Sequence, residues 1–221
     1  RQSREPDGLG DYARALWRHG AATDAINAAQ AAGDQTTAIG WLAEAGGAWF
    51  GHRYGGSAFD RVLSGFSAGA RRSEPVALAL AMRAVKNGRV NRAMQLLAEH
   101  QGHDRLELAA VLDPAGPATT SMRLFRLILA IYEDAEMPPP LADQAFAVLG
   151  RLPGDAHLER GLFYNAMLDV HVRQRRLSEA RALAARAQHH YEAAGTPYLS
   201  FFIHLFTGVI ALMEGMTDAA L

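Results

Sequence analysis

The chain has 221 residues, of which 49% are hydrophobic and 20% are charged. This balance indicates a folded protein with a sizeable core and excludes wholesale disorder. The formal net charge is −1 and there is no cysteine, so the sequence gives no electrostatic case for nucleic-acid binding and excludes disulfides, thiol nucleophiles and thiolate metal sites.

Helix caps and apolar residues at 3.6-residue spacing recur along the whole chain, and no segment alternates apolar and polar residues over the length of a strand. Asp34, Ser73 and Thr196 are expected N-caps, and Asp104 with Glu107 has the spacing of a capping box. We therefore expect more than about 65% helix and no sheet. The expected helices are 10–19, 22–32, 35–49, 57–67, 74–87, 90–100, 104–112, 119–134, 140–150, 156–174, 178–194 and 197–214, with another beginning at 218.

Two stretches interrupt this series of helices and short links. Residues 46–56 are rich in glycine and aromatic residues, and residues 137–140 contain three consecutive prolines, which predict a stiff turn. Short links elsewhere require neighbouring helices to pack as antiparallel pairs. We predict an all-α fold with a single solenoid over 1–221 and a bend near 137–140.

A six-residue pattern recurs between helices, at 20–25, 88–93, 175–180 and 215–220. In three of the four segments a glycine makes the turn, and in all four an alanine one turn into the next helix allows close packing. The last two segments are 40 residues apart. Such periodicity predicts a right-handed superhelix of antiparallel helix pairs, a tetratricopeptide-like solenoid.

The stretch GLFYNAMLDV at 161–170, continuing through RQRRLSEA at 173–180, resembles the tetratricopeptide-like repeats of MalT-type regulators, which are large LuxR-family activators. Residues 19–26 and 31–34 are similar to the region just after the nucleotide-binding module of that family. There, an ATPase module and a winged helix precede the repeats, and a helix-turn-helix follows them. This chain has no phosphate loop and no recognisable helix-turn-helix, so the resemblance carries neither ATP binding nor DNA binding over to it.

The resemblance implies a sensor and oligomerisation segment that binds a small-molecule inducer or a regulatory protein in its superhelix, with possible self-association. The chain begins at Arg1, and Thr217 with Asp218 open a further helix, so we expect it to belong to a longer protein. The alternative is a tetratricopeptide-type adaptor that binds peptides or proteins and is unrelated to transcription.

The longest apolar run is 198–213, which is short for a membrane span and contains three polar residues. No stretch resembles a signal peptide. We expect a buried solenoid helix at 198–213, no membrane contact and a cytoplasmic location.

Asn165, Asp169 and Arg173 form a polar stripe in an otherwise apolar helix, at the spacing that places them on one face. First helices of tetratricopeptide repeats line the concave groove, so we predict that these three residues bind the ligand, with Phe202 and Phe206 as an aromatic wall. The alternative, which we favour, is a solvated helix face with an intrahelical Asp–Arg pair.

Two other clusters have an alternative that we favour over ligand binding. The aromatic segment 49–54, with Phe59 nearby, could stack on a sugar or aromatic ligand, but more often such residues fill a gap between helix pairs. Arg123 and Arg126, with Glu133 and Asp134, could line a second groove, but we expect a solvated face.

No group of residues has the pattern of a catalytic or metal site. The pairs His100 with His103 and His189 with His190 lack carboxylates at the spacing of a helical zinc site. No Gly-x-Ser-x-Gly motif is present, and the acids at 133–136 have no apolar pocket to raise their pKa. We expect no enzymatic activity, no cofactor and no metal.

Overall fold

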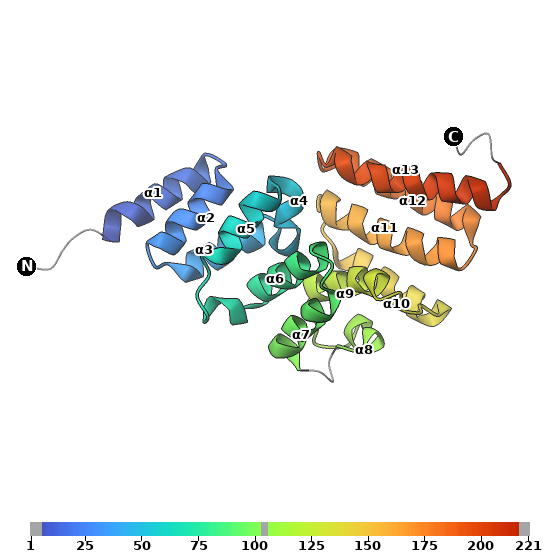
Figure 1. Cartoon of the computed structure of the whole chain (residues 1–221), viewed down its shortest axis with the longest axis horizontal. Helices are drawn as coiled ribbons and strands as arrows, with labels where there is room; N and C mark the ends of the chain where they lie inside the picture. Colours follow the sequence, from blue (N-terminus) through green and yellow to red (C-terminus); the bar gives the residue numbers. More distant parts are fainter. Residues whose placement is uncertain (1–5, 103–105, 217–221) are drawn as a thin grey trace, which may run out of the picture. The chain divides into compact units, whose positions relative to one another are not determined.

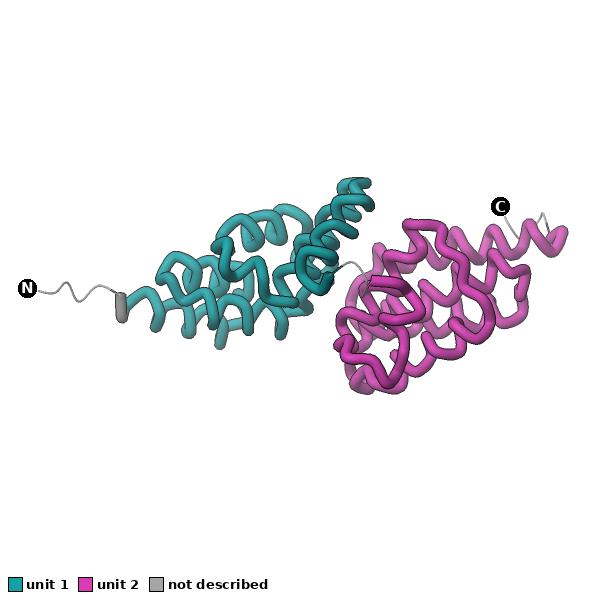
Figure 2. The backbone as a smooth tube through the Cα atoms, turned by 90° about the horizontal axis from the view of Figure 1, so that it is seen from below, with its two compact units in different colours: residues 1–104 teal, residues 105–221 magenta. Residues whose placement is uncertain are grey.

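The computed structural model describes residues 6–102 and 106–216, and these ranges contain 13 α-helices and no strand. Helices account for 77% of the structure, which confirms the predicted all-α class. The chain divides into two compact units, residues 1–104 and residues 105–221, which Figure 2 colours separately. Each unit is built from helices that pack mainly against their neighbours in sequence.

Unit 1 packs its helices around one apolar core. Helix α2 contacts α1, α3 and α5, and α6 contacts α7, α3 and the 3-10 turns (Figure 1). Ile26, Leu42 and Val62 are completely buried, and the rings of Trp17 and Trp41 stack 5.0 Å apart. The elements are α1 (Pro6–Arg18), α2 (Ala22–Ala31), α3 (Gln35–Glu44), η1 (Gly47–Trp49), α4 (Phe50–Tyr54), α5 (Gly56–Ser64), η2 (Ala70–Arg72), α6 (Glu74–Lys86) and α7 (Val90–Gln101).

Unit 2 contains the longest helices. Helix α11 packs most extensively against α12 and also contacts α9 and α13, while α13 lies against α12 (Figure 1). Because three-residue turns join α11 to α12 and α12 to α13, each helix runs antiparallel to the one before it. The helices are α8 (Leu108–Leu112), α9 (Thr120–Tyr132), α10 (Pro139–Arg151), α11 (His157–Arg173), α12 (Leu177–Ala193) and α13 (Pro197–Met213).

Seven helix ends share one turn, the Schellman motif. A residue with positive φ donates its N–H to the carbonyl three residues back, and the next residue donates to the carbonyl five residues back. Four of these turns fall on the six-residue pattern found in the sequence. The positive-φ residues are Gly20, Gly33, Gly88, Asp134, Arg175, Gly195 and Gly215. Superhelical winding of the whole chain stays a prediction.

The predicted helix 35–49 is wrong in its second half. Gly46 and Gly47 adopt φ values of 113° and 55°, which end α3 and begin the short η1 turn. The following stretch, expected to be loose, forms α4. The turn expected at 137–140 lies earlier: residues 133–138 join α9 to α10 inside unit 2, and Pro139 and Pro140 begin α10. The predicted bend stays a prediction.

The predicted N-caps differ in how they work. Asp34 accepts a hydrogen bond from the Thr37 N–H at 3.0 Å, as a capping side chain does. Ser73 and Thr196 occupy the N-cap positions of α6 and α13 but donate their hydroxyls to carbonyls that precede them in the chain. Helix α8 begins at Leu108; Asp104 and the helix start at 218 lie outside the described residues.

Candidate functional site

The predicted stripe lies on the least buried face of α11, and the other faces of this helix are packed against neighbouring helices. Asn165 and Asp169 are half-buried, and Arg173, in the last turn, is exposed. Residues four apart share a helix face, so the three side chains project from the same side of α11. Helices α9 and α13 both contact α11.

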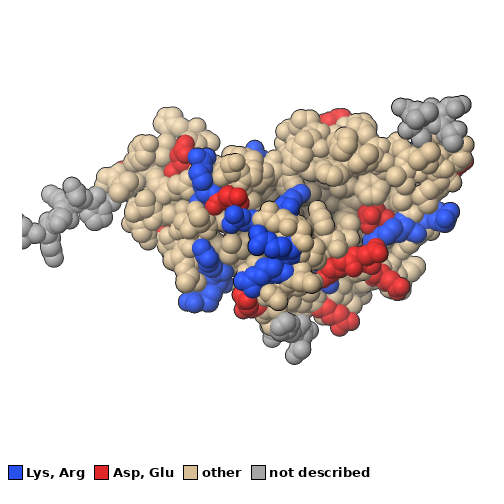
Figure 3. All heavy atoms as spheres, viewed as in Figure 1, with Lys and Arg blue, Asp and Glu red and all other residues tan. Residues whose placement is uncertain are grey.

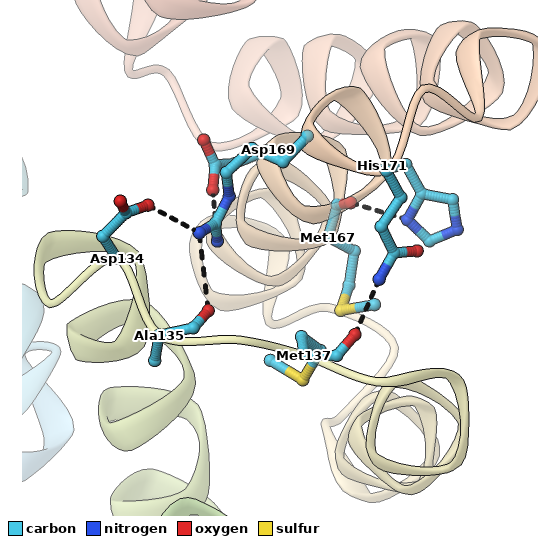
Figure 4. Close-up of polar contacts among 8 residues, drawn as sticks. Asp134, Ala135, Met137, Met167, Asp169 and His171 are labelled. Carbon is cyan, nitrogen blue, oxygen red and sulfur yellow. Dashed lines mark hydrogen bonds and ion pairs between the residues drawn. The ribbon is translucent and has the colours of Figure 1, made fainter.

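Arg173 is held by protein groups. Its Nη1 lies 2.8 Å from Asp134 Oδ1 and donates to the Ala135 carbonyl at 3.4 Å, while Nη2 lies 2.8 Å from Asp169 Oδ2. Figure 4 shows Asp134 and Ala135, from the segment after α9, converging with Asp169 on this one guanidinium group. Arg173 therefore ties the α9–α10 segment to α11.

A small cavity of about 280 Å³ adjoins these contacts of Arg173. Of the three stripe residues, Arg173 lines it, together with Val170 from α11 and with Met137 and Pro138 from the α9–α10 segment. The Gln174 side chain closes the same junction by donating to the Met137 carbonyl at 2.6 Å (Figure 4). Burial raises the pKa of the Asp169 carboxyl, and the neighbouring Arg173 opposes that rise.

Two buried polar groups lie beside the stripe and interact with each other: the side-chain amide of Asn165 and the hydroxyl of Tyr191 on α12. Tyr191 is completely buried, and burial raises its pKa, with the nearby Asn165 side chain opposing the rise. Tyr198 and Tyr132 lie close enough to raise the pKa of Tyr191 further. The structure thus gathers polar groups from α9, α11, α12 and α13 around the predicted stripe.

The three tyrosines were missed because their roles depend on packing between helices. In the sequence, Tyr191 is one member of the apolar stripe of 178–194. In the structure its ring lies over Gly161, where an added Cβ would be 2.6 Å from two ring carbons. A glycine inside one predicted helix and a large aromatic residue in the next helix are the signal that could have predicted the contact between Gly161 and Tyr191.

The predicted aromatic wall stays a prediction. Tyr198, in the first turn of α13, is one of the two tyrosines that raise the pKa of Tyr191, and burial raises its own pKa to about 12. Phe202 and Phe206 follow Tyr198 at intervals of four residues and share its helix face. Phe202 is 44% exposed, so its ring is accessible to a ligand.

The aromatic segment of unit 1 fills the interior, as favoured from the sequence. Trp49, Phe50 and Phe59 are buried, and the ring of Phe50 lies 4.4 Å from that of the exposed Tyr54. Burial lowers the pKa of His52 to about 3, so its imidazole is neutral at physiological pH. Trp49, Phe50 and Phe59 form part of the core around η1 and α4.

The predicted solvated face at Arg123 and Arg126 is wrong, and so is the groove lining considered beside it. Only 2% of Arg123 and 6% of Arg126 is exposed. Arg123 donates three hydrogen bonds to backbone carbonyls between residues 111 and 116. Arg126 donates to the Leu106 carbonyl at 2.9 Å and pairs with Glu133 at 2.7 Å. Both arginines support the irregular segment around α8.

His157, His189 and His190 take part in ring contacts. Nδ1 of His190 lies 3.0 Å from Nδ1 of His157, and the ring of Tyr164 stacks on His190 at 5.5 Å. Burial, followed by the charge of His157, lowers the pKa of His190. Within residues 6–102 and 106–216, no three His, Asp or Glu side chains are grouped as metal ligands. His103 lies outside these ranges.

Helix α13 carries the largest set of exposed apolar side chains. No helix in the described ranges is long and apolar enough to cross a membrane, α13 included. The predicted burial of 198–213 is only half correct. One face of α13 packs on α12 and α11, and another face is exposed to solvent. The exposed residues are Tyr198, Phe201, Phe202, Leu205, Val209 and Leu212.

No family model, curated protein or solved structure matches the chain.

Proposed function

We propose that this chain is the sensing and self-association segment of a MalT-type, LuxR-family transcriptional regulator in the cytoplasm. Its helix pairs form a right-handed, tetratricopeptide-like superhelix, and it binds a small-molecule inducer or a regulatory protein without catalysing a reaction. The support is the all-α build, the resemblance of 161–180 to the repeats of that family, and the polar face of α11.

The observation that carries the binding role is the polar strip on α11, where Asn165 and Asp169 are half-buried and Arg173 lines the adjoining cavity. The Asp169 carboxylate can accept hydrogen bonds from a ligand, and the Arg173 guanidinium group can donate them. The exposed aromatic face that begins at Tyr198 adds apolar surface for affinity.

Asp169→Ala is expected to weaken ligand binding by about 1–3 kcal/mol, because a charged hydrogen bond is lost, while helix content hardly changes. Ligands are identified by a rise in the melting temperature of this chain across a panel of metabolites, and calorimetry then gives Kd for each variant. Asp134→Asn is the matched control: Asp134 pairs with the same arginine but its side chain is 88% exposed. Asparagine also tolerates the positive φ at this position.

Equal Kd values for the wild type, Asp169→Ala and Asn165→Leu would return the stripe to the solvated-face interpretation. The regulator assignment has its own test in the complete gene. A phosphate loop before the repeats and a helix-turn-helix after them are expected; a gene without either favours the adaptor.

Self-association rests on a different observation, the exposed apolar face of α13. Contiguous apolar surface of this kind marks protein–protein contacts. In sedimentation equilibrium from about 1 to 100 µM, the wild type should self-associate, and Phe201→Asp with Leu205→Asp should weaken the association at least about tenfold. The control pair, Leu9→Asp with Tyr12→Asp, changes equally exposed apolar residues of α1 and should leave it unchanged. A wild type that stays monomeric would contradict self-association and favour the adaptor.

A further inference from the structure

Unit 1 contains a surface cavity of about 690 Å³ between η2, α6 and α7. This volume lies within the range of small-molecule sites, about 300–1,000 Å³. Leu80 and Leu96 contribute apolar lining, and the single carboxylate among the lining residues belongs to Glu99. The cationic lining consists of Arg71, Arg72, Arg83, Arg89 and Arg92. The cavity therefore combines an apolar wall with a large excess of guanidinium groups.

Three of the five guanidinium groups have protein partners. Arg83 pairs with Asp60 at 2.6 Å, and Arg92 pairs with Glu99 at 3.1 Å. Arg71 donates its Nε to the Phe66 carbonyl at 3.1 Å. These partners orient the side chains around the cavity and neutralise only part of its charge.

Arg72 and Arg89 differ from the other three. Across residues 6–102 and 106–216, neither guanidinium group forms an ion pair or a hydrogen bond, and both residues are exposed. Arg72 ends η2 and Arg89 precedes α7, so two separate segments bring them to one cavity. Figure 3 shows basic side chains gathered over the region of α6 and α7. Like charges held together in a concavity create a positive potential that attracts anions.

We propose that this cavity binds a small molecule that carries a dianionic group, either a phosphate or two carboxylates, on an apolar body. The planar guanidinium fork donates two parallel hydrogen bonds to either oxyanion, and Arg72 and Arg89 supply two forks with no competing partner. Leu80 and Leu96 contact the apolar body. The site lies in unit 1 and uses none of the residues of α11. The two proposed binding sites can therefore be tested independently of each other.

The test uses phenyl phosphate, phthalate and phenol as probes of the whole chain by calorimetry at low ionic strength. Phenyl phosphate or phthalate should bind, and phenol, which has the apolar body without the charge, should not. Arg72→Gln with Arg89→Gln should weaken the anion at least tenfold and leave the circular dichroism spectrum unchanged, because neither side chain supports the fold. Arg14→Gln with Arg18→Gln removes the same charge from exposed positions on α1 and should preserve binding.

Binding of phenyl phosphate but not phthalate would assign the site to phosphate, and the reverse to dicarboxylates; both support the proposal. Equal loss of affinity in the two double variants would show a general charge effect and overturn it. Equal affinity for phenol and phenyl phosphate would overturn it as well. So would binding of a single-stranded oligonucleotide with no binding of either small anion, because the cavity would then serve a nucleic-acid backbone.

Discussion

Arg123→Leu should lower the free energy of unfolding by about 3 kcal/mol or more. The side chain is buried and its guanidinium group donates to the carbonyls of Val111, Asp113 and Gly116, at 3.1, 2.8 and 2.8 Å. Leucine matches the helix preference of α9 but leaves these carbonyls without their donor, and each unsatisfied buried group costs about 1–3 kcal/mol. The midpoint of urea unfolding, followed by circular dichroism, measures the loss.

Arg176→Leu is the matched control for this prediction. Arg176 is exposed at the N-cap position of α12 and pairs with Glu179 three residues later, a contact worth at most about a few tenths of a kcal/mol. Arg123→Lys should recover little of the stability, because one ammonium group cannot reach three carbonyls from the guanidinium position. Equal urea midpoints for Arg123→Leu and Arg176→Leu would contradict the structural role of Arg123.

Gly161→Ala should destabilise the chain by about 2–3 kcal/mol, although alanine is the better helix former by about 1 kcal/mol. The added methyl would lie 2.6 Å from two carbons of the Tyr191 ring. That ring is completely buried, so it cannot turn away without moving α12. Thermal unfolding of the variant measures the effect.

Gly150→Ala provides the comparison, because a Cβ added at Gly150 on α10 meets no atom within 4 Å. This variant should gain up to about 1 kcal/mol from helix propensity alone. Adding Tyr191→Leu to Gly161→Ala should return part of the lost stability, since the clash is removed. Two glycine variants that shift the melting temperature by the same amount in the same direction would rule out the close approach.

The helices could be predicted because their signals are local. Caps, turn glycines and apolar spacing act within a few residues, and ten of the thirteen α-helices begin within two residues of a predicted start. The glycine-rich interruption at 46–56 was predicted, but the helix before it was extended too far, to residue 49, because apolar residues continue across Gly46 and Gly47. Local patterns could not divide the chain into its two compact units, because that division depends on which helices pack together.

The candidate sites could be predicted only where one helix contains them. The spacing of Asn165, Asp169 and Arg173 follows from the sequence, but the partners of Arg173 come from the distant segment after α9. Arginines were expected at the surface, but residues 122–130 of α9 are buried on every side of the helix, and the two arginines are buried with them. The arginine cavity of unit 1 combines three elements whose approach no local pattern encodes.

All three tryptophans, Trp17, Trp41 and Trp49, lie in unit 1, where two of them stack and the third is buried. Light that excites indole but not phenol is therefore absorbed only by unit 1, and the resulting emission reports the environment of that unit alone. Tyrosine emission comes from both units, because Tyr12 and Tyr54 lie in unit 1 and the other four in unit 2. The natural chromophores thus provide an optical label for one half of the molecule without chemical modification.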